Sequence, residues 1–396
     1  MKFSAKIERC SLSPIRKFNP LALEAERAGK TIYHLNIGQP DVPTPKEYFD
    51  AIKNFSQEVL AYAPSPGISE LLEAIKLYYE KINAPISISD ILISNGGSEA
   101  LMMVMSCILD DNDEILVPEP YYPNYSTFVN LTGGMIHPIT TTPEEGYKYA
   151  IKERIESQIN SHTRAILFTN PGNPTGTVLT KDELIMLADI AKEHNLFLIG
   201  DEVYREFVYN DEPLASLLQL KGYDENIVVI DSVSKRFSAC GARIGCVISR
   251  NEELMNNIMK WCQARLCVPT LDQIGATALY NVGPDYFDSV RKEYRNRKDA
   301  LIEELKKIPG VVYSNPVGAF YVMAALPLDD TDKFQYWLLQ EWDDHGDTVM
   351  YSPAESFYST AGLGKNEIRM AYVIEVEKIR RSIEILGNAI AAYNSK

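Results

Sequence analysis

The segment from 165 to 200, AILFTNPGNPTGTVLTKDELIMLADIAKEHNLFLIG, decides the fold class. Ala165–Thr169 and Leu196–Gly200 are continuous apolar runs, which is typical of strands buried on both faces. In KDELIMLADIAKEHN, between them, the apolar residues recur at helical spacing, and Thr180 is placed to cap the helix. A buried strand, a helix and a second buried strand predict a parallel sheet covered by helices.

The same alternation extends over much of the chain. Four further strands are predicted at Ile91–Ser94, Glu114–Val117, Ile227–Ile230 and Ile244–Ile248. Longer amphipathic stretches separate most of these short apolar runs. We therefore predict an α/β fold whose large domain has a mainly parallel sheet between helices.

The pattern changes near Gly283-Pro284, which suggests a second, smaller α+β domain. Its predicted elements are a charged helix at 285–308, strands at 319–326, near Val349 and at 368–373, a helix from Thr331 and a final helix at 375–393. The first 44 residues are expected to contain one short helix and to pack near the cleft. The predicted division is a large domain at 45–283, with 1–44 and 284–396 forming the N-terminal segment and the small domain.

Composition narrows the class of protein. The 396 residues carry a formal net charge of −15, which argues against nucleic acid or an anionic membrane surface as a partner. The longest apolar stretch, 100–109, is too short to span a bilayer, and the first ten residues are too polar for a signal-peptide core. The six cysteines form no CxxC pair, so we expect reduced thiols and a cytoplasmic location.

Polar residues follow the predicted strands. Asn95-Gly-Gly-Ser-Glu99 opens a helix after one strand, where glycines and free amides favour an anion. NPGNPTG (170–176) follows another strand, and its prolines and glycines fix a rigid loop around Asn173. Asp201-Glu-Val-Tyr204 and Asp231-Ser-Val-Ser-Lys235 follow two more. Because open α/β sheets bind ligands at the carboxyl ends of their strands, these residues are the candidate site.

Other catalytic patterns give no alternative reading. Ser232 and Lys235 form an S-x-x-K string, which also marks serine β-lactamases, but S-D-N and K-T-G are missing. HExxH, GxxxxGK[ST] and GxSxG are missing too, and the five histidines are scattered. We predict no metal site.

A larger set of residues resembles one enzyme family. In chain order these are Gly38, Tyr62, Gly97-Ser98-Glu99, Tyr122, NPGNPTG, Asp201-x-x-Tyr204, S-x-S-K-x7-R (232–243) and Arg369. Together they resemble the class I/II aminotransferases, the pyridoxal 5'-phosphate (PLP) enzymes of fold type I. The resemblance runs from about Ile15 to the last helix, with aspartate aminotransferases as the nearest type.

The resemblance implies three catalytic residues: Lys235, Asp201 and Tyr204. Lys235 would bind PLP as a Schiff base and later carry the proton between the substrate Cα and the cofactor. Asp201 would pair with the pyridinium nitrogen, so that the ring draws electrons from the substrate. Tyr204 and Asn173 would hydrogen-bond the phenolic oxygen, and Tyr122 would stack on the ring.

The resemblance also implies how the charged ends are bound. The phosphate would be held by Ser98, Ser232, Arg243 and the amides from Gly97 to Glu99. Arg369 would bind the substrate α-carboxylate, which matches its planar fork of donors. Gly38 would lie beside the substrate. Tyr62 would reach the phosphate of a neighbouring subunit, which implies a homodimer with shared active sites.

The expected reaction moves an amino group between an L-amino acid and a 2-oxo acid in two half-reactions. Aspartate with 2-oxoglutarate is the first expectation, and Arg265 and Arg16 are the two candidates for binding a side-chain carboxylate. A PLP-dependent β-lyase, a decarboxylase and a non-catalytic PLP-binding regulator are the alternatives. Relatives of this fold also imply cis peptides at Glu119-Pro120 and Asn173-Pro174.

Overall fold

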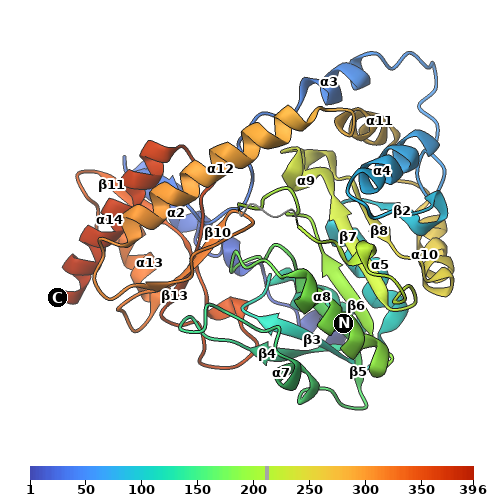
Figure 1. The fold of residues 1–396 in the computed structure, drawn as a ribbon. Helices are drawn as coiled ribbons and strands as arrows, with labels where there is room; N and C mark the ends of the chain where they lie inside the picture. Colours follow the sequence, from blue (N-terminus) through green and yellow to red (C-terminus); the bar gives the residue numbers. More distant parts are fainter. Residues whose placement is uncertain (210–213) are drawn as a thin grey trace.

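The computed structural model describes residues 1–209 and 214–396, and its centre is a seven-stranded sheet (Figure 1). The strand order is β2-β8-β7-β6-β5-β3-β4, and all neighbours are parallel except β8, which is antiparallel to both of its neighbours. The strands are β2 (Ile91–Ser94), β3 (Glu114–Glu119), β4 (Met135–Thr140), β5 (Thr163–Thr169), β6 (Phe197–Asp201), β7 (Ile227–Ser232) and β8 (Gly245–Ile248). The predicted α/β class and mainly parallel sheet are confirmed.

Helices cover both faces of this sheet, and alternate strand residues point to opposite faces. In β5, Ile166 and Phe168 join one apolar core, while Ala165 and Leu167 join the other. The first core is covered by α4 (Ser69–Lys81), α8 (Lys181–Glu193) and α11 (Thr270–Leu279). The second is covered by α5 (Gly97–Ile108), α6 (Asn124–Thr132) and α10 (Glu252–Arg265). The predicted cap at Thr180 is confirmed, since its hydroxyl accepts from the amide of Glu183.

The C-terminal region forms a second layer around a four-stranded sheet of order β12-β13-β10-β9. Its elements are α12 (Pro284–Leu305), β9 (Val312–Tyr313), β10 (Tyr321–Ala325), α13 (Thr331–Gln340), β11 (Asp347–Met350), β12 (Ser352–Pro353), β13 (Glu367–Ala371) and α14 (Val376–Asn394). The long helix α12 leads from the side of α11 to this region, where it packs on α14 (Figure 1).

The N-terminal segment differs from the expectation of one short helix. It contains α1 (Ala5–Glu8), the 3-10 turn η1 (Pro14–Arg16), α2 (Asn19–Arg27) and β1 (Thr31–His34). β1 pairs in parallel with β11, more than 300 residues further along the chain. This pairing ties the start of the chain to the C-terminal region.

The remaining short elements connect these layers. They are α3 (Lys46–Lys53), α7 (Lys152–Glu156), α9 (Val233–Arg236), η2 (Ile88–Asp90), η3 (Leu217–Gln219), η4 (Cys240–Ala242) and η5 (Glu355–Phe357). None of the helices in the described residues is long and apolar enough to cross a membrane.

Candidate active site

Three neighbouring parallel strands bring the predicted residues to one edge of the sheet. In the β5–β6 pair Thr169 lies opposite Asp201, and in the β6–β7 pair Asp201 lies opposite Ile230. The NPGNPTG loop, Asp201 and the segment that carries Lys235 therefore leave the sheet side by side. The predicted cis peptides at Glu119-Pro120 and Asn173-Pro174 are confirmed, and Asn170-Pro171 is also cis.

A cavity of about 490 Å³ lies at this edge, which is within the usual size of a small-molecule site. It collects most of the predicted site residues: Gly38, Gly97, Ser98, Tyr122, Asn173, Asp201, Tyr204, Ser232, Lys235, Arg243 and Arg369. Two predicted residues do not line it. The carboxylate of Glu99 accepts from the amide of Asn95 at 2.6 Å and pairs with Arg265 at 2.8 Å, and Tyr62 projects from an exposed loop.

One end of the cavity suits a phosphate. Gly96 precedes α5, and Gly97 and Ser98 in the first turn, where backbone amides have no helical partner, line the cavity. Gly96 has a φ of 79°, a conformation that favours glycine, and a Cβ there would also press on the guanidinium of Arg243. Ser232 is buried and accepts from the amide of Ser234 at 3.1 Å.

The opposite side presents a buried carboxylate. Asp201 Oδ2 accepts a hydrogen bond from the Tyr125 hydroxyl at 2.6 Å, and Oδ1 accepts from the amide of Val203 at 3.4 Å. Burial raises the pKa of Asp201 to about 6, because these bonds replace only part of the lost hydration. A cationic N–H in the cavity would stabilise this carboxylate.

Lys235 projects from the short helix α9 into the same space. Its Nζ donates to the carbonyl oxygen of Gly38 at 2.9 Å and lies 4.0 Å from Sγ of Cys240. The Lys235 amine thus contacts the N-terminal segment, at Gly38, inside the cavity.

Asn173 links Tyr204 to Arg369. Its Nδ2 donates to the Tyr204 hydroxyl at 3.5 Å, and its Oδ1 accepts from Nη1 of Arg369 at 3.2 Å. Tyr204 also exchanges a hydrogen bond with Tyr321 at 3.0 Å.

Arg369 is buried. Its guanidinium lies 4.6 Å from the centre of the Tyr321 ring, Nη2 donates to the carbonyl of Asn36, and Nε has no hydrogen-bond partner among the described residues. No carboxylate lies within 4 Å of it in the part of the chain that the structure describes. Burial lowers the pKa of this guanidinium, since its charge has lost water and gained no anion. A bound carboxylate would supply the missing charge.

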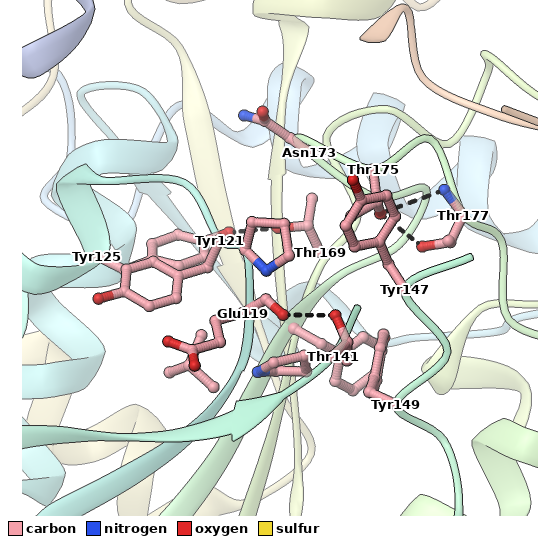
Figure 2. A pocket seen from close by; sticks show the side chains of 15 residues that line it. Glu119, Tyr121, Tyr125, Thr141, Tyr147, Tyr149, Thr169, Asn173, Thr175 and Thr177 are labelled. Carbon is pink, nitrogen blue, oxygen red and sulfur yellow. Dashed lines mark hydrogen bonds between the residues drawn. The ribbon is translucent and has the colours of Figure 1, made fainter. Parts of the chain in front are cut away.

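A second cavity, of about 30 Å³, shares Asn173 with the first, and Figure 2 shows the residues that line it. This volume has room for water only. Tyr125 lines it and exchanges a hydrogen bond with Thr169 at 2.7 Å. Tyr125 thus supports Asp201 from behind.

The sequence analysis missed two residues of this network. Tyr125 follows Tyr122 by three residues on the segment already singled out, so helical spacing could have identified it. Tyr321 lies in the apolar strand β10. From sequence alone, an aromatic residue in such a strand cannot be told apart from a residue of the hydrophobic core.

The residues present fit PLP. The cavity offers an anion seat, a buried carboxylate suited to a cationic ring nitrogen, a primary amine between them and an uncompensated guanidinium for a substrate carboxylate.

Comparison with known proteins defines the class. Residues 30–386 match the family "Aminotransferase class I and II". The chain is 28% identical to an aspartate aminotransferase of Bacillus subtilis over the whole of both chains. It is 32% identical to a (5-formylfuran-3-yl)methyl phosphate transaminase of Methanocaldococcus jannaschii, over 92% of this chain and 93% of that protein.

A solved structure shares the whole fold. The aspartate aminotransferase of Thermus thermophilus with maleate superposes with a TM-score of 0.89 at 27% identity, over 98% of this chain and 100% of that one. The chain belongs to the class I and II aminotransferases, a PLP-dependent family, and it is a transaminase. Its substrates are therefore amino acids and 2-oxo acids.

Proposed function

We propose that this transaminase uses L-aspartate as amino donor and 2-oxoglutarate as acceptor. The observation that carries transamination of a carboxylate substrate is the buried, uncompensated guanidinium of Arg369, joined to Lys235 and Asp201 in one cavity. Relatives named aspartate aminotransferase support aspartate as the donor, and the maleate bound to the Thermus enzyme is itself a dicarboxylate.

PLP, when bound, supplies the electron sink that lets the Cα–H bond of the substrate break. We propose that Gly97, Ser98, Glu99, Ser232 and Arg243 hold its phosphate. Glu99 takes part only through its backbone amide, because its carboxylate is paired with Arg265.

The other residues orient and tune the ring. Asp201 would keep a proton on the ring nitrogen by offering a negative charge in a dry site. Tyr204 and Asn173 would donate hydrogen bonds to the phenolic oxygen, and Tyr122 would cover the ring face. Because Asp201, Tyr204 and Asn173 are buried and each is hydrogen-bonded within the protein, they require little rearrangement when the cofactor enters.

At the substrate end Arg369 binds the α-carboxylate in a two-bond fork, beside Asn173 and Gly38. Lys235 would hold the cofactor through its amine, and once a substrate amine has displaced it, the free amine would be the base that carries the Cα proton. Its hydrogen bond to the Gly38 carbonyl holds the amine near this position.

We further propose an obligate homodimer in which Tyr62 completes the phosphate site of the partner subunit. In the single chain Tyr62 is 79% exposed, and Val59 and Leu60 beside it are 71% and 58% exposed. An apolar, exposed loop of this kind favours a protein partner. A division into a large domain at 45–283 and a small domain built from 1–44 and 284–396 agrees with the sheets: the seven-stranded sheet lies within 45–283, and the four-stranded sheet and the β1–β11 pair lie outside it. The cytoplasmic location stays a prediction.

The test is a panel of L-amino acids incubated with the holoenzyme and 2-oxoglutarate. Formation of glutamate and oxaloacetate from aspartate, at the highest kcat/KM of the panel, is the expected result. Pyruvate and ammonia released without any 2-oxo acid would instead establish the β-lyase alternative. Another donor preferred over aspartate would refute the substrate assignment.

A further inference from the structure

The active-site cavity holds one more cation than the proposed function uses. Its charged lining residues are Arg16, Asp201, Lys235, Arg243 and Arg369. Three of the four cations have roles toward the cofactor or the α-carboxylate, and Arg16 has none. The chain as a whole has a net charge of −15, whereas the side chains that line the cavity are mostly cationic.

The N-terminal segment is anchored so that Arg16 faces this space. Lys17 pairs with Asp332 on α13 at 2.7 Å, and Phe18 is buried. η1, which ends at Arg16, contacts β12, and there Ser352 lies opposite Arg369 in the sheet register. Arg16 and Arg369 therefore reach one cavity from neighbouring elements.

Tyr122 relates the two guanidinium groups to each other. Burial raises the pKa of the Tyr122 phenol to about 12, and the positive charges of Arg369 and Arg16 both oppose that rise. Both guanidinium groups thus act on one side chain, Tyr122, which lines the same cavity as they do.

The guanidinium of Arg16 is free to bind a ligand. Within residues 1–209 and 214–396 it makes no hydrogen bond and no ion pair, and it is exposed to solvent at the cavity mouth. Arg265, the other sequence candidate, is committed elsewhere. It pairs with Glu99 at 2.8 Å, donates to the carbonyl of Ser65 at 3.1 Å, and does not line the cavity.

We propose that Arg16 binds the side-chain carboxylate of a dicarboxylic amino acid whose α-carboxylate lies on Arg369. This inference rests on the proposed function. A guanidinium matches a carboxylate with two parallel hydrogen bonds, so two arginines in one cavity select a substrate with an anion at each end. A substrate with a neutral side chain leaves the Arg16 guanidinium hydrated, which costs little free energy. We therefore expect dicarboxylic substrates to be preferred but neutral amino acids to react as well.

The test compares Arg16→Gln with the wild-type holoenzyme in single turnovers without a 2-oxo acid, because 2-oxoglutarate is itself a dicarboxylate. The ratio of the second-order rate constants for L-aspartate and L-alanine is expected to fall by about 10- to 100-fold, the usual effect of losing a hydrogen bond to a charged group. Arg16→Lys should retain part of the ratio. Arg27→Gln, which removes an exposed cation from α2, is the matched control and should keep the ratio.

Binding gives a readout that needs no turnover. Calorimetry should show maleate bound more weakly by Arg16→Gln by a similar factor, with the dissociation constant of propionate changed less than about threefold. An unchanged aspartate-to-alanine ratio, or equal losses for maleate and propionate, would overturn the role of Arg16. A higher rate with O-phospho-L-serine than with aspartate would overturn the carboxylate assignment. If the wild type converts no amino acid at all, the proposed function fails instead.

Discussion

Asp201→Asn should stabilise the cofactor-free protein and weaken its hold on PLP. The carboxylate is buried, and among residues 1–209 and 214–396 no cationic side chain is bonded to it. Asparagine keeps the shape: its amide oxygen can accept from the Tyr125 hydroxyl as the carboxylate does, and Thr169 can still donate to the Tyr125 oxygen. The substitution therefore removes the charge with little change in packing.

The magnitude follows from the pKa of Asp201, which rises from 3.8 to about 6 in the folded protein. At about 1.4 kcal/mol for each tenfold change in proton affinity, the ionised carboxylate costs about 3 kcal/mol of folding free energy. Because the folded pKa lies above the unfolded one, this cost is absent below about pH 4 and complete above about pH 6. At pH 5 roughly half of it remains.

The assay is urea unfolding of cofactor-free protein at pH 5 and pH 8, at one fixed protein concentration. At pH 8 the free energy of unfolding of Asp201→Asn should exceed that of the wild type by up to about 3 kcal/mol. At pH 5 this difference should be smaller by about 1.4 kcal/mol. Asp329→Asn, at an exposed position, is the control and should show neither effect. A lower stability of Asp201→Asn at pH 8, or an unchanged dissociation constant for PLP, would contradict the electrostatic account.

Three further outcomes are expected. Arg369→Lys should lose about 2–5 kcal/mol of transition-state binding, seen as kcat/KM, with an unchanged cofactor absorbance spectrum; a loss of only a few fold would refute its role. Tyr62→Ala and Lys235→Ala, refolded together, should regain activity above the sum of the separate proteins, because one site of each hybrid dimer is then intact; no regain, or a monomer by light scattering, would reject the shared site. Tyr125→Phe should raise the dissociation constant of PLP about tenfold above pH 6 by removing the donor to Asp201; an unchanged constant would show that this bond is not needed.

The sequence predicted the large sheet well because its strands are buried on both faces. β5 and β7 were visible as apolar runs, and each ends at a polar residue that the parallel register brings to the site. The candidate site was predictable for the same reason, since strand ends of a parallel sheet meet at one edge.

Pairings between distant segments were not predictable. β1 is only partly buried, and its partner lies at the other end of the chain, so no local pattern marks it. β4 was also missed, because it is a half-exposed edge strand interrupted by Pro138. The choice between Arg16 and Arg265 likewise required the structure, since only packing shows that one is free and the other is bonded to Glu99.

We propose that Lys235 covalently holds the cofactor of this transaminase. Borohydride reduction of the holoenzyme, followed by peptide mapping, identifies the lysine that carries it. A single pyridoxyl label is expected, on Lys235, and it should be lost when an amino-acid substrate is added before reduction. A label on any other lysine, or one that survives the substrate, would contradict it.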